Sequence, residues 1–356
     1  MLFKKSILFL SIVLILAQGQ QLQGLEYIKY GHDGLKLLND QLGQSKYAIF
    51  DLNSTNGESS FNINEVTYKV PISIQATAQS LRKETQCEGI YYTFSEFQKK
   101  YGESITFSAG LGISNFTIPL GINRQLDYFK QQMTQKDKAI SVSQSRWAMY
   151  CLTTAPAFLM PLNPLFLQSL DSLNKLAKTP QNNTQQTMYN DIVSLFGTHY
   201  VNSVVLGGSA KIYTILDKNY LKTVSYQEIK TQISIDYSYQ VFEFQYGYNS
   251  SDIAQKLDEN FMKSKEDVII FSPEVDFKQN PKAWETWESN VQKQPQPVSS
   301  SVSYISDLVY QYPEVQAHLR KTIDFYLKNS KLPSFDQIQD QKIEFKQKIQ
   351  NKVLFV

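Results

Sequence analysis

The sequence has few of the residues, and none of the short motifs, from which most enzyme sites are built. Its 356 residues include only two cysteines and three histidines, and no Cys/His spacing suits zinc. It contains no Gly-X-Ser-X-Gly motif, no His-Glu-X-X-His motif and no phosphate-binding loop. The paired acids Glu285 and Glu288 are interpreted as a solvated helix face. A hydrolase is therefore disfavoured, and we expect no enzyme activity, metal, cofactor or small-molecule substrate.

Neither sign of charge is in large excess, since Lys and Arg total 35 against 33 Asp and Glu. Bulk electrostatics do not draw such a chain to nucleic acid or to anionic lipid. The sequence also has no basic tract, which disfavours a nucleic-acid partner. With 42% hydrophobic and 19% charged residues, the composition is that of a folded globular protein.

Long apolar runs are absent except near the start of the chain. Lys4 and Lys5 precede an apolar stretch over residues 7–16, and small residues follow at the positions that a signal peptidase reads. The alternative is a membrane anchor, but a spanning helix needs roughly 20 apolar residues, about twice this stretch. Residues 1–19 are therefore predicted to be a cleaved secretory signal. We expect a protein that is made soluble and is then secreted or held in a secretory granule.

Secretion would permit two covalent modifications. In an oxidising compartment, Cys87 and Cys151 are predicted to form one disulfide that closes a loop of about 65 residues. The alternative is a pair of buried free thiols. Asn-X-Ser/Thr sequons mark candidate glycosylation sites, and these sites are Asn53, Asn115, Asn182 and Asn249.

Residues 104–123 alternate between apolar residues and small or polar ones, in two halves separated by Ser114 and Asn115. This period predicts β-strands with one apolar face, and each half approaches the ~9–11 residues of a membrane strand. The alternative is an ordinary half-buried strand pair. From residue 124 to residue 138 the pattern becomes helical and polar. The apolar positions are Ile105, Phe107, Leu111 and Ile113 in the first half and Phe116, Ile118, Leu120 and Ile122 in the second.

A second alternating segment, over residues 231–248, is rich in aromatic side chains and is also predicted to be β-structure. Residues 252–265 then have a helical pattern. The apolar positions of the strand pattern are Ile233, Ile235, Tyr237 and Tyr239, and after a change of phase Phe242 and Phe244.

Between these segments the sequence predicts two amphipathic helices, over residues 164–178 and 187–196. Two β-type runs follow, over residues 200–206 and 209–216. Gly207 and Gly208 interrupt them and mark a bend or bulge. A Pro/Gln/Ser-rich stretch over residues 292–301 is interpreted as a linker.

The most informative feature is a short run at the end of the second helix. An aromatic residue, Gly, Thr, His and Tyr are followed, after six residues, by two glycines. The run consists of Phe196, Gly197, Thr198, His199, Tyr200, Gly207 and Gly208. It resembles the signature of the membrane attack complex/perforin family. A loosely similar family feature is the turn at residues 30–34, where His32 stands in place of an aromatic residue.

The resemblance implies an α+β fold with a bent, twisted central antiparallel sheet flanked by two helical clusters. It implies a family domain over residues 20–330 and leaves a C-terminal helical tail over residues 331–356. Gly207 and Gly208 would lie at the hinge of the sheet. The two alternating segments would unfold from the helical clusters and re-form as membrane hairpins. Cys87 and Cys151 would bracket the first of them, much like a disulfide seen in relatives.

The function implied by the resemblance is that of a pore-forming protein. Its partners would be a lipid membrane and further copies of itself, because a transmembrane sheet must close into a barrel. The alternative is a non-lytic family member that acts in adhesion or in binding to a matrix or surface. His199 is interpreted as a structural residue, with His32 and His318 in unrelated contexts. Valine at Gly207 and Gly208 is expected to permit secretion but to reduce pore formation.

Overall fold

The computed structural model describes residues 22–37, 44–53, 57–109, 124–178, 182–246, 251–275 and 283–338. The predicted signal at residues 1–19 and most of the C-terminal tail lie outside these ranges. Within them, no helix is both long and apolar enough to cross a membrane.

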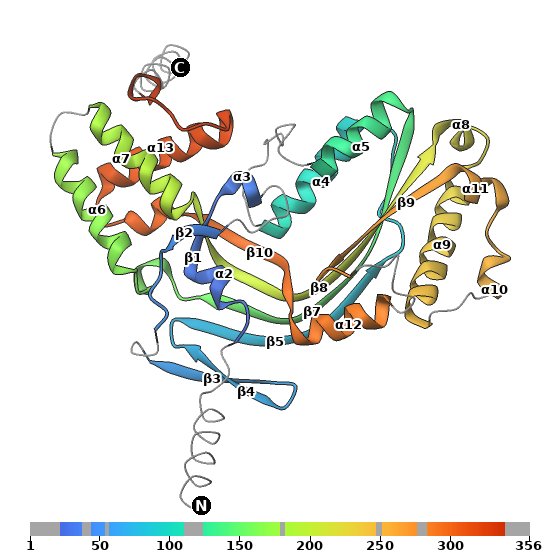
Figure 1. Ribbon diagram of the computed structural model, residues 1–356, viewed down its shortest axis with the longest axis horizontal. Helices are drawn as coiled ribbons and strands as arrows, with labels where there is room; N and C mark the ends of the chain where they lie inside the picture. The colour runs from blue at the N-terminus through green and yellow to red at the C-terminus, as the bar shows by residue number, and fades with distance from the viewer. Residues whose placement is uncertain are drawn as a thin grey trace, which may run out of the picture.

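The centre of the fold is an antiparallel sheet in which every pairing joins antiparallel strands. Its two long inner strands are β7 (Lys138–Thr154) and β8 (His199–Asp217). The strand β5 (Ile74–Thr85) pairs with β7 on one side. On the other side, β9 (Lys265–Ser272) pairs with the second half of β8 and β10 (Gln296–Tyr304) with its first half. The sheet is strongly curved (Figure 1).

Shorter strands complete the sheet at its two ends. The strand β1 (Tyr30–His32) pairs with the first residues of β8, and β2 (Gln44–Ala48) pairs with β1. The strand β6 (Ile90–Tyr91) pairs with β7. A separate hairpin, β3 (Glu58–Ile63) and β4 (Val66–Pro71), lies below β5 in Figure 1.

One end of the sheet is covered by α6 (Pro164–Ala177), α7 (Asn183–Phe196) and α13 (Pro313–Asn329). Asn163 and Asn182 cap α6 and α7 by accepting backbone N–H groups of Leu165 and Gln185. These helices confirm the prediction from the 3.6-residue period. Short helical elements α2 (Leu25–Lys29), α3 (Gly34–Leu37), η2 (Ala157–Leu159) and η3 (Ile305–Val309) connect the parts around this end.

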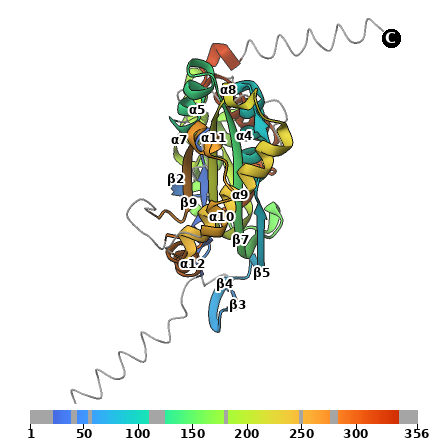
Figure 2. The same cartoon turned by 90° about the vertical axis from the view of Figure 1, so that its right-hand side faces the viewer.

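The other end is flanked on both faces by helices. On one side lie α4 (Phe94–Ala109) and α5 (Arg124–Gln135). On the other lie α8 (Lys218–Leu221), α9 (Tyr226–Tyr246), α10 (Ser251–Ala254) and α11 (Glu259–Ser264), which Figure 2 shows from the end of the sheet. A further helix, α12 (Ala283–Lys293), crosses the sheet near its middle. The structure therefore confirms a bent antiparallel sheet with two helical clusters.

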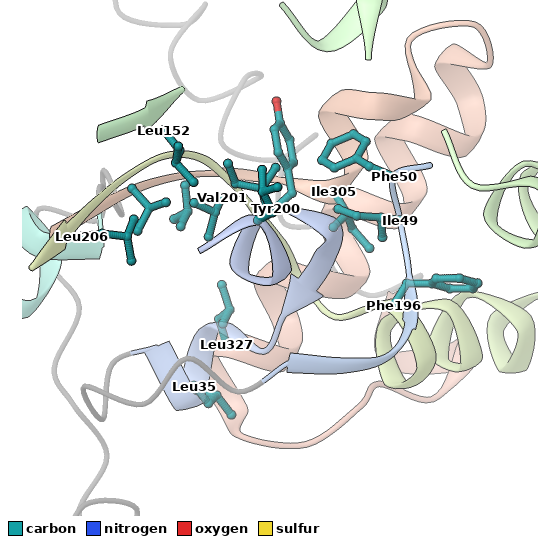
Figure 3. Packing of buried hydrophobic residues seen from close by; sticks show 14 of the residues in the cluster. Leu35, Ile49, Phe50, Leu152, Phe196, Tyr200, Val201, Leu206, Ile305 and Leu327 are labelled. Carbon is teal, nitrogen blue, oxygen red and sulfur yellow. The ribbon is translucent and has the colours of Figure 1, made fainter. Parts of the chain in front are cut away.

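The apolar core forms along β8, which is buried over most of its length. Near its start, Tyr200 meets Phe50 edge to face at 5.6 Å, beneath α7 and α13. Figure 3 shows Val201, Leu206 and Ile305 in the same packed region. A second, smaller cluster joins Leu216 of β8 to α9 and α11.

The structure contradicts three predicted elements. Residues 104–109 and 231–246 are helical rather than extended, and residues 296–304 form β10 rather than a linker. In α9, Ile229, Ile233 and Tyr237 recur every four residues and form a buried helical face. Period-2 and period-4 patterns coincide at such positions, so alternation alone could not distinguish strand from helix. The helix predicted from residue 124 is present as α5, which ends at Gln135, and residue 138 already begins β7.

Candidate functional site

The signature run forms the corner at which α7 ends and β8 begins. Gly197 adopts a φ of 85°, and a Cβ there would lie 2.7 Å from the His32 backbone nitrogen. The Thr198 N–H donates to the His32 carbonyl at 2.9 Å, and the Thr198 hydroxyl accepts the Gly34 N–H at 2.7 Å. The corner is therefore joined to the turn at residues 30–34. The signature run and the turn at residues 30–34, which both resemble features of the same family, are therefore in direct contact.

Two buried histidines face each other across this corner. His32 and His199 are directly paired residues of β1 and β8. The His32 Nε2–H donates to the Tyr27 carbonyl, and His199 Nδ1 lies 2.8 Å from the Thr198 hydroxyl. The His199 ring also packs on Tyr304 at 4.5 Å. The expectation that His32 occupies an unrelated context is therefore wrong, because sequence separation hid a cross-strand pair.

Burial lowers the pKa of both rings. Loss of hydration, with a smaller contribution from the Arg320 charge, lowers the pKa of His199 to about 3. Burial also lowers the pKa of His32, partly opposed by its bond to Tyr27. Both histidines are therefore neutral at pH 7 and serve as buried structural groups.

Acid is expected to destabilise the fold through this corner. An unfolded histidine gains a proton as the pH falls through 6.5, whereas folded His199 stays neutral down to about pH 3. Stability is thus intact above pH 6.5 and is lost below it, by about 1.4 kcal/mol per pH unit for each excluded proton. Urea unfolding of wild type and His199→Gln between pH 7.5 and 4.5 measures this. Below pH 6.5, the free energy of unfolding of the variant should change with pH by about one proton less than that of the wild type. Equal slopes in the two proteins would contradict the assignment.

Gly207 and Gly208 are required because neighbouring parts of the protein approach their Cα atoms so closely that a side chain would not fit. A Cβ on Gly207 would lie 1.8 Å from the Trp147 carbonyl oxygen of β7. A Cβ on Gly208 would lie 2.2 Å from Val291 and 3.0 Å from Trp287, both on α12. The β7–β8 register shifts beside Gly207, between Ala148 and Tyr150. The predicted irregularity is present, and α12 rests directly on it.

The helix α12 ties three strands together at this point. The Trp287 indole N–H donates to the Ser272 carbonyl of β9 at 3.0 Å. Glu288 accepts from Trp284 at 3.0 Å and pairs with Arg82 of β5 at 2.7 Å. Glu288 is therefore no simple member of a solvated face, which corrects the interpretation from sequence. These contacts hold β5, β8 and β9 in one curved arrangement.

The first alternating segment lies partly in α4 and α5. Ile105 and Phe107 are in α4, whereas Leu111, Ile113, Phe116, Ile118, Leu120 and Ile122 lie outside the described residues. The Phe129 ring of α5 packs at a tilt against Tyr213 of β8, with ring centroids 4.7 Å apart, and meets Phe97 of α4 edge to face at 5.3 Å. The Tyr128 hydroxyl donates to Glu266 of β9 at 3.0 Å. Aromatic packing thus holds α4 and α5 on this face of the sheet.

The second alternating segment forms α9 on the opposite face. Ile233 packs with Ala139 of β7 and Leu216 of β8. Because successive side chains of a strand point to opposite faces, Ile140 and Ile215 point to the α5 side. Ile233 and Tyr237 are buried, and Ile235 and Tyr239 are half-buried. Phe242 and Phe244 also belong to α9.

The structure contradicts the predicted disulfide. Cys87 lies 3.4 Å from the Ser141 hydroxyl, and Cys151 lies 3.3 Å from the Ser203 hydroxyl. Ser141 and Cys151 are ten positions apart along β7, which corresponds to roughly 33 Å at the rise of a strand. A bridge requires Cα atoms within about 7 Å. Both thiols are free and half-buried. They are far apart because residues 86–137 leave and rejoin the sheet near the start of β7, whereas Cys151 lies near the end of that strand.

Two of the candidate glycosylation sites can be placed. Asn53 and Asn182 are exposed, and the Asn182 side-chain oxygen caps α7. Asn115 and Asn249 lie outside the described residues.

Comparisons with known proteins agree with this architecture. A family model described as the MAC/Perforin domain matches residues 17–335. The 67 kDa subunit of perivitellin-2 from Pomacea maculata is 23% identical over 325 residues, which cover 88% of this chain and 54% of the relative. The same subunit from Pomacea canaliculata matches equally. The chain thus spans about half the length of the curated relatives it matches.

The fold itself is similar to that of a solved structure. GNIP1Aa from Chromobacterium piscinae superposes with a TM-score of 0.62 at 15% identity, covering 87% of this chain and 57% of that one. At this level of identity the likeness concerns the fold alone.

Proposed function

The chain belongs to the MAC/Perforin domain family, and on this premise we propose that it is a secreted pore-forming protein. Copies of the chain assemble on a target membrane, and each inserts two amphipathic β-hairpins into a shared barrel. The family domain would extend over residues 20–330 and carry this activity without enzyme chemistry.

The observation that carries the proposal is the place where both helical segments join the sheet. Residues 86–137 connect β5 to β7, and residues 218–264 connect β8 to β9. Lys138, Asp217 and Lys265 lie at one end of the sheet, since Lys138 pairs with Asp217 and Lys265 with Leu216. If both segments became extended, they would lengthen the neighbouring strands β5, β7, β8 and β9 in one direction. Each is long enough for two membrane strands of ~9–11 residues.

The double period of α9 supports the same conversion. Residues 229–240 present Ile229, Ile233 and Tyr237 to the core as a helix. In a strand, the odd positions of this stretch would form a face that is apolar except at Thr231, and the even positions would carry only polar side chains. The same residues can therefore pack on the sheet as a helix in the water-soluble form. As a strand, they would present one face to lipid and the other to water.

Assembly of several copies follows from the chemistry of the bilayer. Every backbone hydrogen bond must be satisfied in lipid, so four strands from one chain cannot span alone. The outer edges of β5 and β9 pair with no other described strand, and they are available to neighbouring copies. The proposal therefore includes a ring or arc of identical subunits.

Vesicle leakage and electron microscopy test the proposal. The purified mature chain should release an encapsulated dye from lipid vesicles at sub-micromolar concentration and form arcs or rings on them. Binding without release would instead favour a non-lytic adhesion or surface-binding role. The sequons at Asn115 and Asn249 favour that second role, because a glycan on a membrane strand would block its insertion.

A further inference from the structure

A buried polar cluster joins α9 to β9 beneath the second helical segment. Asp236 and Gln240 come from α9, and Lys265 and Asp267 come from β9. The Lys265 ammonium donates to Asp236 Oδ2 at 2.7 Å and also to Asp267 Oδ2. The Gln240 amide N–H groups donate to the same two oxygens, at 2.7 and 2.9 Å. Only 2% of Asp236 and 6% of Gln240 is exposed.

The charges in this cluster do not balance. Two carboxylates share one ammonium, which leaves an excess negative charge in a site with little access to water. Asp267 Oδ1 and Gln240 Oε1 are also buried acceptors that have no hydrogen-bond partner within the described ranges. A single added proton would neutralise the excess charge and turn one carboxylate into a donor for such an acceptor.

Among the residues that the structure describes, no other charged side chain makes a hydrogen bond or ion pair with the cluster. On the sheet, Ala139 and Leu216 face α9, and Phe261 of α11 lies 5.9 Å from the Lys265 ammonium. Arg82 of β5 pairs with Glu84 and with Glu288 of α12, and Glu266 contacts Tyr128 on the opposite face. Lys230 and Lys256 border a groove of about 400 Å³ between α9 and α10.

We propose that Asp236, Gln240, Lys265 and Asp267 form a proton-dependent latch, in which one bound proton holds α9 on the sheet and its loss favours release. This inference rests on the proposed function, in which α9 leaves the sheet to become a membrane strand. Asp236 and Gln240 would then lie on the polar phase of that strand, where water can hydrate a charged carboxylate.

The sign of the effect follows from proton linkage. In the docked helix, loss of hydration and the neighbouring Asp267 carboxylate raise the pKa of Asp236 to about 6, with Lys265 opposing them. A hydrated aspartate titrates near 3.8. The docked state therefore binds a proton that the released state does not bind between these values. Raising the pH through this window weakens docking, by a factor on the order of 100. Acid retains α9, and neutral pH frees it.

Hydrogen–deuterium exchange tests the latch without lipid. After correction for intrinsic exchange rates, amides of α9 should lose protection by about 10-fold relative to α13 between pH 5.0 and 7.5, the part of the window that this range covers. Asp236→Asn and Asp267→Asn remove the excess charge and should abolish most of this dependence. Glu266→Gln removes a carboxylate of the same strand that faces the other side, and it should retain the dependence. The same pH dependence in all four proteins would overturn the proposal.

Dye release from phosphatidylcholine vesicles then links the latch to activity. The wild type should release dye faster at pH 7.5 than at pH 5.0, and Asp236→Asn should show a much smaller ratio. An equal ratio in both proteins would refute a role of the latch in insertion. Absence of release at every pH would refute the pore-forming proposal instead, while the exchange experiment would still decide whether the latch exists.

Discussion

A cleavable tether between α5 and β9 is expected to abolish vesicle leakage, and reduction of the tether is expected to restore it. Tyr128 and Glu266 are suitable positions, because their side chains meet at 3.0 Å near the surface. Cysteines at both positions, in a chain with Cys87→Ser and Cys151→Ser, would be joined by a short bis-methanethiosulfonate reagent. If residues 86–137 must leave the sheet to insert, the tether prevents the first hairpin from forming.

A matched tether separates this mechanism from a general effect of cross-linking. Lys138 and Asp217 are paired residues of β7 and β8 whose side chains meet at 3.1 Å. Those strands remain neighbours in the proposed pore, so Lys138→Cys with Asp217→Cys should leak normally when joined. Dye release at equal protein concentration is the readout. Undiminished release by the Tyr128–Glu266 tethered protein would exclude the first segment from the mechanism.

Replacement of Gly207 by alanine is expected to destabilise the whole fold by at least about 3 kcal/mol. The added methyl group would lie 1.8 Å from a backbone oxygen of β7 and 3.2 Å from the Ala148 Cα. Backbone of a central strand cannot move aside without breaking the pairing on both sides. This contact changes the expectation from sequence, because Gly207→Val should prevent folding before any effect on pore formation can be seen.

Urea denaturation and the yield of folded protein measure the effect of Gly207→Ala. Ser209→Ala provides the control, since it changes a half-buried position of the same strand by a single hydroxyl. The control should stay within about 0.5 kcal/mol of wild type, the range usual at such positions. A Gly207→Ala protein with an unchanged unfolding midpoint would show that the β7–β8 contact is not required.

Local patterns were sufficient for the helical end of the molecule and for the signature. The apolar period in residues 164–178 and 187–196 matches α6 and α7, because both helices bury one stripe on the same core. Gly197 ends α7 with a positive φ, as glycine at that position predicts. The family signature was readable because its residues are adjacent in sequence.

Alternating patterns misled at the two segments proposed to change conformation. In α9, residues 229, 233 and 237 satisfy both a helix and a strand. Which of the two forms is adopted depends on the surface that the segment can cover. In the described structure that surface is the face of β7 and β8 around Ala139 and Leu216. The sequence of the segment alone contains no information about this partner.

The sequence by itself determined the family, the helices around the signature and the positions where glycine is required. Only the tertiary structure brought His32 to His199, separated Cys87 from Cys151 and gathered Asp236, Lys265 and Asp267 around one site. The physical reason is that backbone conformation and periodicity depend on near neighbours in sequence. Burial, charge balance and contact across a sheet depend on residues that the fold brings together from distant positions.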